Sequence, residues 1–370
     1  MSSTDFDVKK FQDKLKEEFG KVMDDGKVPP STPEPAEPKE PLFKKVEPVS
    51  NRGKISFGTL HSQVNIPSDK NIYISKKDVY KDDHWHEDVR GFIPEKMDGW
   101  GIDPDLLLII HQSWTLKKPL QITGYPGASK DYTIRYYCSV HRIPYFMDIG
   151  MDDKTPHDIV GSYIPQGGGE YFHEIKPLYL LGLHGGVYVD SEPYVNPSSV
   201  NFCKQRLTDS DRVLYLSGCP DPQKIAMVVN PEFAIMATTN VRGTGDNVDQ
   251  YSATLNQDIS SINRYALFYH ADYLNPSLEI QLLTNKFPTL EPRLIKKLVQ
   301  MGNLVRQAWK QRTVELPWSV RQLLSWADSC VRYNEPVTGF KECYFNVLNE
   351  VEQDELRKHW RDVDFEEYKL

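Results

Sequence analysis

The sequence predicts an α/β fold, in which a parallel sheet covered by helices is followed by a helical region. Short apolar segments of strand character alternate with helical segments between residues 101 and about 275. These strands are apolar throughout instead of alternating with polar residues, which is typical of a sheet buried on both faces. From residue 288 onward the pattern is helical, most clearly over 291–311.

The elements of the predicted core follow one another in a regular order. The expected helices are 106–114, 133–141 and 178–185. The expected strands are 119–124, 144–150, 186–190 and 233–240, with a further strand after Arg264. Because a parallel strand needs a crossover connection, each helix is expected to lie on a face of the sheet.

Composition limits the class of protein and the kind of partner. The 370 residues are 39% hydrophobic and 26% charged, which fits a globular chain with two or three folded units. The net charge of −8 disfavours nucleic acid as a partner. The five cysteines include no CxxC pair, which favours free thiols. No apolar run approaches the ~18 residues of a membrane span and no signal peptide is recognisable, so we expect a cytoplasmic protein without a membrane partner.

The first 53 residues divide into two predicted segments. Residues 1–25 form an amphipathic helix, in which the apolar residues Phe6, Phe11, Leu15, Phe19 and Val22 recur at helical spacing. This helix can pack on the body of the protein or bind a partner, and the sequence leaves both open. Residues 26–53 are rich in proline, glutamate and lysine, which predicts a semi-rigid linker.

Residues 54–90 predict a small extension that precedes the core. It has strand-like pieces at 54–60 and 71–75. In its sequence HWHED, His84 and His86 alternate as neighbours on a strand would, and Glu87 follows. A metal site and a polar loop anchored by a tryptophan are the two interpretations, and the loop is favoured.

The stretch PLQITGYPGASKDYTIRYYC, residues 119–138, predicts a phosphate-binding loop. Gly124 follows a strand and Lys130 opens a helix. In such a setting backbone N–H groups at the helix N-terminus surround a phosphate, and a lysine ammonium reaches the terminal phosphates. The expected loop consists of Gly124, Tyr125, Pro126, Gly127, Ala128, Ser129, Lys130 and Asp131.

Four more polar residues stand where a site at one edge of the sheet would need them. Asp190 ends a strand, where a carboxylate can hold magnesium. Asn240 ends the next strand and can position a water molecule, although an asparagine also commonly starts a turn. Arg264 precedes the last strand. Arg321 lies in the first turn of a helix capped by Ser319; there it opposes the helix dipole, which points to a bound anion or to solvent.

In this order, the motifs resemble those of AAA+ ATPases, and more closely the cobalt-chelatase small-subunit and MoxR-type branch. The resemblance runs from GFIPEKMDGWGIDPDLLL (91–108) to the C-terminus. Its most specific parts are HDIVGSYI (157–164) and NVRGTGDNVDQYSATLNQDISSINRY (240–265). The segments SVRQLLSWADSC (319–330) and YFNVLNEVEQDELRKHW (344–360) also match. The resemblance implies a P-loop NTPase core over 91–285 and a helical lid over 286–370.

The resemblance also implies cofactors, roles and an assembly. ATP and Mg²⁺ are the implied cofactors, with Asp190 as the magnesium-associated carboxylate. Asn240 resembles the first sensor of the family. Arg264 resembles an arginine finger that reaches the nucleotide of a neighbouring subunit, and Arg321 resembles the second sensor on the lid. The implied assembly is a hexameric ring that remodels a protein client, whose identity the sequence does not indicate.

The chain departs from the family pattern at three positions. The family has Ser or Thr after the lysine, whereas Asp131 places negative charge against the phosphates, at a cost on the order of 4 kcal/mol at ~4 Å and a dielectric near 20. Ser129 replaces the last glycine of the loop and is strained if that position needs positive φ. The family has adjacent Asp and Glu, whereas Ser191 separates Asp190 from Glu192. On a continuing strand Glu192 points to the other face, and on a loop it can still reach the site.

Two functions follow from this pattern. The first is a ring-forming protein that remodels a partner with ATP, with hydrolysis weakened at Asp131 and Ser191 and with Glu192 as the base that polarises water. The second is a non-catalytic scaffold or regulator that forms rings without turnover. Whether the chain is an ATPase therefore stays open.

Overall fold

The computed structural model describes residues 53–216, 219, 225–240, 263–365 and 370. The predicted amphipathic helix (1–25) and almost all of the predicted linker (26–53) lie outside the described residues. Residues Asn51–Leu370 form one compact unit. Within the described residues, no helix combines the length and the apolar character that crossing a membrane requires.

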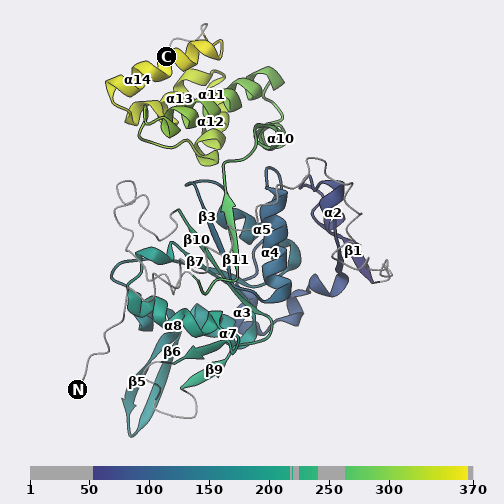
Figure 1. Cartoon of the computed structure of the whole chain (residues 1–370), viewed down its shortest axis with the longest axis vertical. Helices are drawn as coiled ribbons and strands as arrows, with labels where there is room; N and C mark the ends of the chain where they lie inside the picture. The colour runs from purple at the N-terminus through teal and green to yellow at the C-terminus, as the bar shows by residue number, and fades with distance from the viewer. Residues whose placement is uncertain (1–52, 217–218, 220–224, 241–262, 366–369) are drawn as a thin grey trace, which may run out of the picture. The chain divides into compact units, whose positions relative to one another are not determined.

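A five-stranded parallel sheet forms the centre of this unit (Figure 1). Its strands are β3 (Leu120–Gly124), β4 (Tyr145–Ile149), β7 (Gly186–Ser191), β10 (Phe233–Thr239) and β11 (Leu267–Ala271). The order is β11-β3-β10-β7-β4, and all four pairings are parallel. Every residue of β7 and β10 is buried, as their uniform apolar character predicts. The predicted fold class is confirmed.

Helices cover the sheet. They are α4 (Pro104–Leu116), α5 (Lys130–His141), α7 (Pro177–His184) and α8 (Ser198–Thr208). The start of α4 is encoded locally, because the Asp103 side chain accepts from the Asp105 N–H and proline occupies the first helical position. Two hairpins, which the sequence did not predict, complete this part of the chain. They are β5 (Gly161–Gly167) with β6 (Glu170–Ile175), after the short α6 (Pro156–Val160), and β8 (Val213–Tyr215) with β9 (Ala226–Val228).

The extension before the core packs on it instead of standing apart. Phe57, Trp85 and Val89 belong to the same buried cluster as the sheet strands. The regular elements are β1 (Lys54–Ser56), α2 (Phe57–Leu60), β2 (Tyr73–Ser75), α3 (Glu87–Arg90) and the 3₁₀ turns η1 (Ser68–Lys70), η2 (Lys76–Asp78) and η3 (Asp82–His84).

Two predictions for the extension were wrong in detail. The first strand stops at Ser56, because the Ser56 hydroxyl caps α2 by accepting from the Thr59 N–H. His84 and His86 do not alternate along a strand: His84 ends a 3₁₀ turn and His86 caps α3.

The helical region that follows the sheet has its own core, in which Trp318, Trp326 and Phe340 are fully buried. Its elements are α10 (Pro276–Lys286), α11 (Pro292–Lys310), α12 (Val320–Tyr333), α13 (Pro336–Cys343), η5 (Phe345–Val347) and α14 (Glu350–Asp362). Leu283 of α10 is part of this core. The helical region therefore begins at α10, before the expected residue 286.

A chain of buried hydrogen bonds joins the extension to α5. His141 Nδ1 lies 2.6 Å from the Asp78 carbonyl oxygen and must donate to it, so His141 Nε2 is an acceptor. His61 Nε2–H then donates to it at 3.2 Å, and His61 Nδ1 accepts from the Tyr136 hydroxyl at 3.4 Å. Burial lowers the pKa of His61 to about 2, of His141 to about 3 and of the neighbouring His111 to about 4. Burial thus favours the neutral form of all three histidines.

These histidines predict loss of stability in mild acid. In the unfolded chain these histidines protonate near pH 6.5, whereas in the folded protein they stay neutral to about pH 4. Their contribution to the free energy of unfolding is therefore complete above pH 6.5 and falls as the pH drops below that value. Each proton taken up only by the unfolded chain is worth about 1.4 kcal/mol per pH unit. Denaturant unfolding between pH 7.5 and 5 measures the slope. His111→Met should reduce it, whereas exposed His84→Gln should not; equal slopes in all three proteins would contradict the assignment.

Candidate functional site

A cavity of about 440 Å³ lies where the loop after β3, the ends of β7 and β10, and helices α10 and α12 meet. Its size is in the range of small-molecule sites. The predicted site residues that line it are Pro126, Gly127, Ala128, Ser129, Lys130, Asp131, Glu192, Asn240 and Arg321. Four predicted residues are not part of its lining: Gly124, Tyr125, Asp190 and Arg264.

The loop between β3 and α5 has the left-handed backbone that its glycines predict. Gly124 has φ +152°, and a Cβ there would lie 2.0 Å from the Ala271 carbonyl oxygen. Gly127 has φ +73°, and a Cβ there would lie 2.2 Å from the Ser319 Cβ at the start of α12. Ser129 also has positive φ, at 58°, without a capping hydrogen bond from its side chain. The last position of the loop therefore carries the strain expected of a non-glycine residue.

Lys130 joins the loop to the end of β10. Its ammonium donates to the carbonyl oxygens of Gly124 at 2.8 Å and Tyr125 at 3.1 Å, and to Asn240 Oδ1 at 2.9 Å. Burial lowers the pKa of Lys130, and the nearby Glu192 and Asp131 carboxylates oppose this shift. The structure therefore brings Lys130 and Asn240 together, 110 residues apart in the sequence.

Glu192 reaches the cavity because β7 ends at Ser191. The chain then turns left-handed, with φ 54° at Glu192, whose N–H donates to the Thr238 carbonyl oxygen at 2.7 Å. The Glu192 carboxylate accepts from the Asn240 N–H at 3.1 Å and from the Thr239 hydroxyl at 3.2 Å. Burial raises the pKa of Glu192, and the Asn240 N–H and Lys130 oppose this rise. Of the two positions that the sequence left open for Glu192, the structure has the one on a loop.

Asp190 requires a correction. Its carboxylate forms a buried ion pair with Lys204 of α8 and does not face the cavity. The reason is strand alternation: Asp190 and Ser191 are successive residues of β7 and point to opposite faces. Burial raises the pKa of Asp190, and the Lys204 ammonium opposes this rise. The expected convergence of Asp190 with Lys130 and Asn240 is not found.

Asp131 does face the site. It lies in the first turn of α5, where the helix dipole stabilises a negative charge. Its Oδ1 accepts from the Thr238 hydroxyl on β10 at 2.5 Å. A carboxylate and a hydroxyl therefore meet beside Lys130.

Arg264 lies outside the lining of the large cavity. Its guanidinium pairs with Asp209 at 2.7 Å, and it lines a separate cavity of about 40 Å³ together with Asp190 and Lys204. A role toward a neighbouring subunit's nucleotide is not tested by one chain and stays a prediction.

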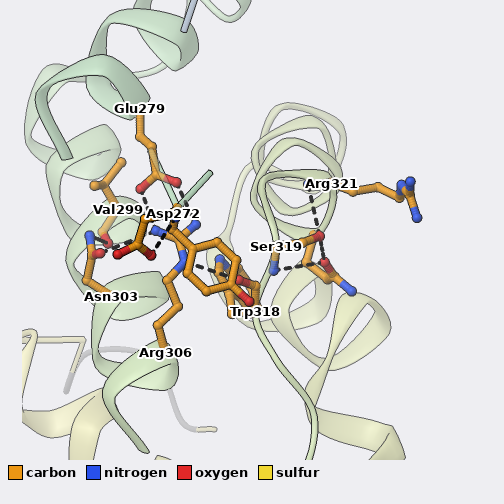
Figure 2. A network of polar contacts seen from close by, with 10 residues as sticks. Asp272, Glu279, Val299, Asn303, Arg306, Trp318, Ser319 and Arg321 are labelled. Carbon is orange, nitrogen blue, oxygen red and sulfur yellow. Dashed lines mark hydrogen bonds and ion pairs between the residues drawn. The ribbon is translucent and has the colours of Figure 1, made fainter. Parts of the chain in front are cut away.

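Arg321 is held at the cavity by the helical region. Figure 2 shows it extending away from a polar network in which buried Arg306 pairs with Glu279 of α10 and donates to the Trp318 carbonyl oxygen. Ser319 and Gln322 form the capping box that starts α12, which confirms the predicted helix cap. Within the described part of the chain, the Arg321 guanidinium forms no ion pair or hydrogen bond. The cavity is thus lined by an arginine that has no ion-pair partner among the described residues.

Sequence reasoning missed the apolar end of the cavity. Trp100, Gly101, Leu282 and Leu324 line it. Trp100 is half-buried and packs against the small cluster that contains Leu282. One signal in the sequence could have indicated this end: a tryptophan between two glycines directly precedes the first core helix. Nothing in the sequence indicated that residues of α10 and α12 would contact it.

The histidines of the extension are separated by the structure. His84 Nε2 pairs with Glu232 at 2.7 Å. His86 instead stacks on His184 with ring centroids 3.9 Å apart, and Asp88 lies 3.3 Å from His86 Nδ1 and 3.5 Å from His184 Nε2. Glu87 is not part of this group. The predicted trio His84, His86 and Glu87 is therefore not brought together.

The Arg306–Glu279 pair predicts a large cost when one partner is removed. Glu279 is fully buried, so Glu279→Gln leaves the Arg306 charge uncompensated and should lower the free energy of unfolding by about 3–5 kcal/mol. Asp328→Asn is the matched control, because it breaks an exposed pair with Arg332 in the same helical region and should cost under about 1 kcal/mol. Chemical denaturation measures both, and similar costs would show that the buried pair does not hold α10 to α11.

The backbone at Ser129 predicts a stabilising substitution. Ser129→Gly removes the left-handed penalty and should raise the free energy of unfolding by about 1 kcal/mol. Ser129→Ala keeps a Cβ and should give no such gain. Thermal unfolding of the two variants checks this, and a glycine variant no more stable than the alanine variant would show that the loop is relaxed at this position.

Comparison with known proteins gives one informative sequence match. The chain is 22% identical over 278 residues to the aerobic cobaltochelatase subunit CobS of a Sinorhizobium species, covering 73% of this chain and 82% of that protein. No protein-family model matches the chain.

Solved structures of similar fold have low identity. A putative ATPase from Cytophaga hutchinsonii is 13% identical, with 74% of this chain and 90% of that chain covered and a TM-score of 0.38. The RuvB Holliday junction branch migration motor of Thermotoga maritima is 10% identical, with 73% and 72% covered and a TM-score of 0.43.

The motifs, the parallel sheet with its helical lid and the CobS match agree with one another. The similarity to CobS therefore supports the resemblance to the cobalt-chelatase branch of the AAA+ ATPases that the sequence predicts.

Proposed function

We propose that the cavity binds ATP. The observation that carries this proposal is that Lys130, Asn240, Glu192 and Arg321, from four distant parts of the sequence, line one cavity at the N-terminus of α5. The N–H groups of the loop and the first turn of α5 supply an anion site, and Lys130 and Arg321 supply positive charge. Trp100 offers an aromatic face for the base at the apolar end.

The residues present also fit a magnesium ion. Asp131 offers a carboxylate beside hydroxyl and phosphate oxygens, which are the ligands Mg²⁺ prefers. When bound, the ion would neutralise phosphate charge. Asp190 has no part in this, because Lys204 holds it on the other face of the sheet.

Hydrolysis is proposed to be slow. Glu192 is the residue placed to orient a water molecule, but its carboxylate already accepts from the Asn240 N–H and the Thr239 hydroxyl. Asp131 adds a second negative charge near the phosphates. A poorly placed base costs ~100- to 10,000-fold in rate.

The assembly we propose is a hexameric ring that remodels a protein client, with Arg264 facing the next subunit. The name of the CobS relative describes a subunit of a larger enzyme, which supports an assembly. The second candidate is a scaffold that forms the ring without turnover. The Lys130 ammonium favours this scaffold, because it already donates to three protein oxygen atoms. A phosphate would have to compete with these oxygen atoms for the ammonium.

Three measurements test the proposal: calorimetric titration, phosphate release and native mass measurement. Calorimetric titration with ATP should show binding to the full chain, reduced at least tenfold in Lys130→Met because the phosphate-facing charge is removed. Lys118→Met, an exposed lysine outside the cavity, is the control and should bind normally. Absence of ATP binding to the unaltered chain would overturn the proposal.

Phosphate release and native mass measurement separate the two candidates. Slow turnover together with a nucleotide-dependent ring supports the remodelling protein, and a ring with no turnover supports the scaffold. Turnover of about one per second or faster, within the ordinary enzyme range, would contradict weakened hydrolysis.

A further inference from the structure

We propose that His86, Asp88 and His184 bind one zinc ion at the surface of the protein. His86 and Asp88 lie at the start of α3, and His184 lies in the last turn of α7. Each residue offers one ligand atom, and the three atoms all lie within 4.8 Å of one another. None of the three residues lines the cavity proposed to bind ATP, so this inference does not depend on the proposed function.

The distances between the ligand atoms are close to those of a zinc site. Asp88 Oδ2 lies 3.3 Å from His86 Nδ1 and 3.5 Å from His184 Nε2. Zinc binds nitrogen and oxygen at about 2.0–2.2 Å in a tetrahedral arrangement, so two ligand atoms on one ion are about 3.3 Å apart. Both contacts of Asp88 therefore already have the separation that a shared ion requires.

The contact between His86 and Asp88 has no hydrogen atom along it. His86 Nδ1 accepts a hydrogen bond from the Asp88 backbone N–H at 3.3 Å, so this nitrogen carries a lone pair instead of a proton. An ionised carboxylate also only accepts hydrogen bonds. Two electron-pair donors thus face each other in this contact, and a cation between them would turn their repulsion into attraction.

The kinds of ligand favour zinc over other ions. Mg²⁺ and Ca²⁺ take oxygen ligands, whereas imidazole nitrogen suits zinc and other transition metals. Two histidines and one carboxylate can also hold iron(II) for reactions with oxygen. Here, however, the site is open to solvent, because the side chains of His86 and Asp88 are 48% and 49% exposed. A redox-inactive ion that links two elements fits such a position better than a reaction centre.

Zinc at this position would fasten the extension to the core. The extension contains α3, which packs against α7 through its contacts and through the fully buried Val89. The rings of His86 and His184 already stack, with centroids 3.9 Å apart and planes 6° apart. Three protein ligands and a water molecule hold zinc less tightly than the four protein ligands of a structural site. We therefore infer a reversible clamp, in which zinc tightens an attachment that exists without it.

Calorimetric titration of the metal-free full chain with Zn²⁺ tests the site, and one ion per chain should bind. Loss of even a supporting residue typically costs about 10- to 100-fold in metal affinity, so His86→Gln and Asp88→Asn should each weaken binding at least tenfold. His84→Gln is the matched control, because it removes the other histidine of the same segment, which pairs with Glu232, and it should bind zinc normally. Excess Mg²⁺ should not displace the zinc.

Hydrogen–deuterium exchange gives a readout at the site itself. Zinc should slow amide exchange in α3 and in the last turn of α7, because the ion restrains both elements. His86→Gln should abolish this effect, and His84→Gln should keep it. At a concentration 100-fold above its dissociation constant, zinc should also raise the midpoint of thermal unfolding of the unaltered chain by at least about 2 °C.

Three outcomes would overturn the proposal. The first is an unaltered chain that binds no zinc. The second is equal zinc affinity in the unaltered chain, His86→Gln and Asp88→Asn, because other residues, such as the five cysteines, would then hold the ion. The third is zinc binding that leaves amide exchange in α3 and α7 unchanged, which would show that the ion does not join these two helices.

Discussion

The hydrogen bond between the Lys130 ammonium and Asn240 is the contact on which the rest of the site depends. It is possible because β3 and β10 are neighbours in a parallel sheet, so that the loop after one strand and the last residue of the other meet at the same edge. The backbone of Asn240 then holds the Glu192 carboxylate, which follows the adjacent β7. One edge of the sheet thus organises the loop, the amide and the acid.

The core could be predicted from the sequence, because its strands are short, apolar and separated by helices. The directions of the side chains at the end of β7 were harder to predict. The sequence leaves a strand position and a loop position open for Glu192. It does not indicate that strand alternation turns Asp190 away from the site. The left-handed backbone at Glu192 directs this residue to the cavity. A glutamate gives no local signal for positive φ, so this turn followed from tertiary contacts.

The helical region shows a second limit of sequence reasoning. Its helices and the Ser319 cap were predictable, since periodicity and capping are local. The buried pair between Arg306 and Glu279 was not, because it joins two helices through charges that sequence patterns assign to solvent. Yet this pair and the donation from Arg306 to the Trp318 carbonyl oxygen fix the chain directly before α12, and so position Arg321 (Figure 2).

The charges around the cavity come from both the retained and the altered motif residues. Lys130, Lys286 and Arg321 supply three positive charges, and Asp131 and Glu192 supply two negative ones. An anion that enters this cavity would therefore meet a small excess of positive charge. The substitution that looks like damage in the loop, an aspartate where a hydroxyl is expected, therefore has a different consequence from loss of the lysine. It leaves the Lys130 ammonium in place and lowers the net positive charge of the cavity by one unit.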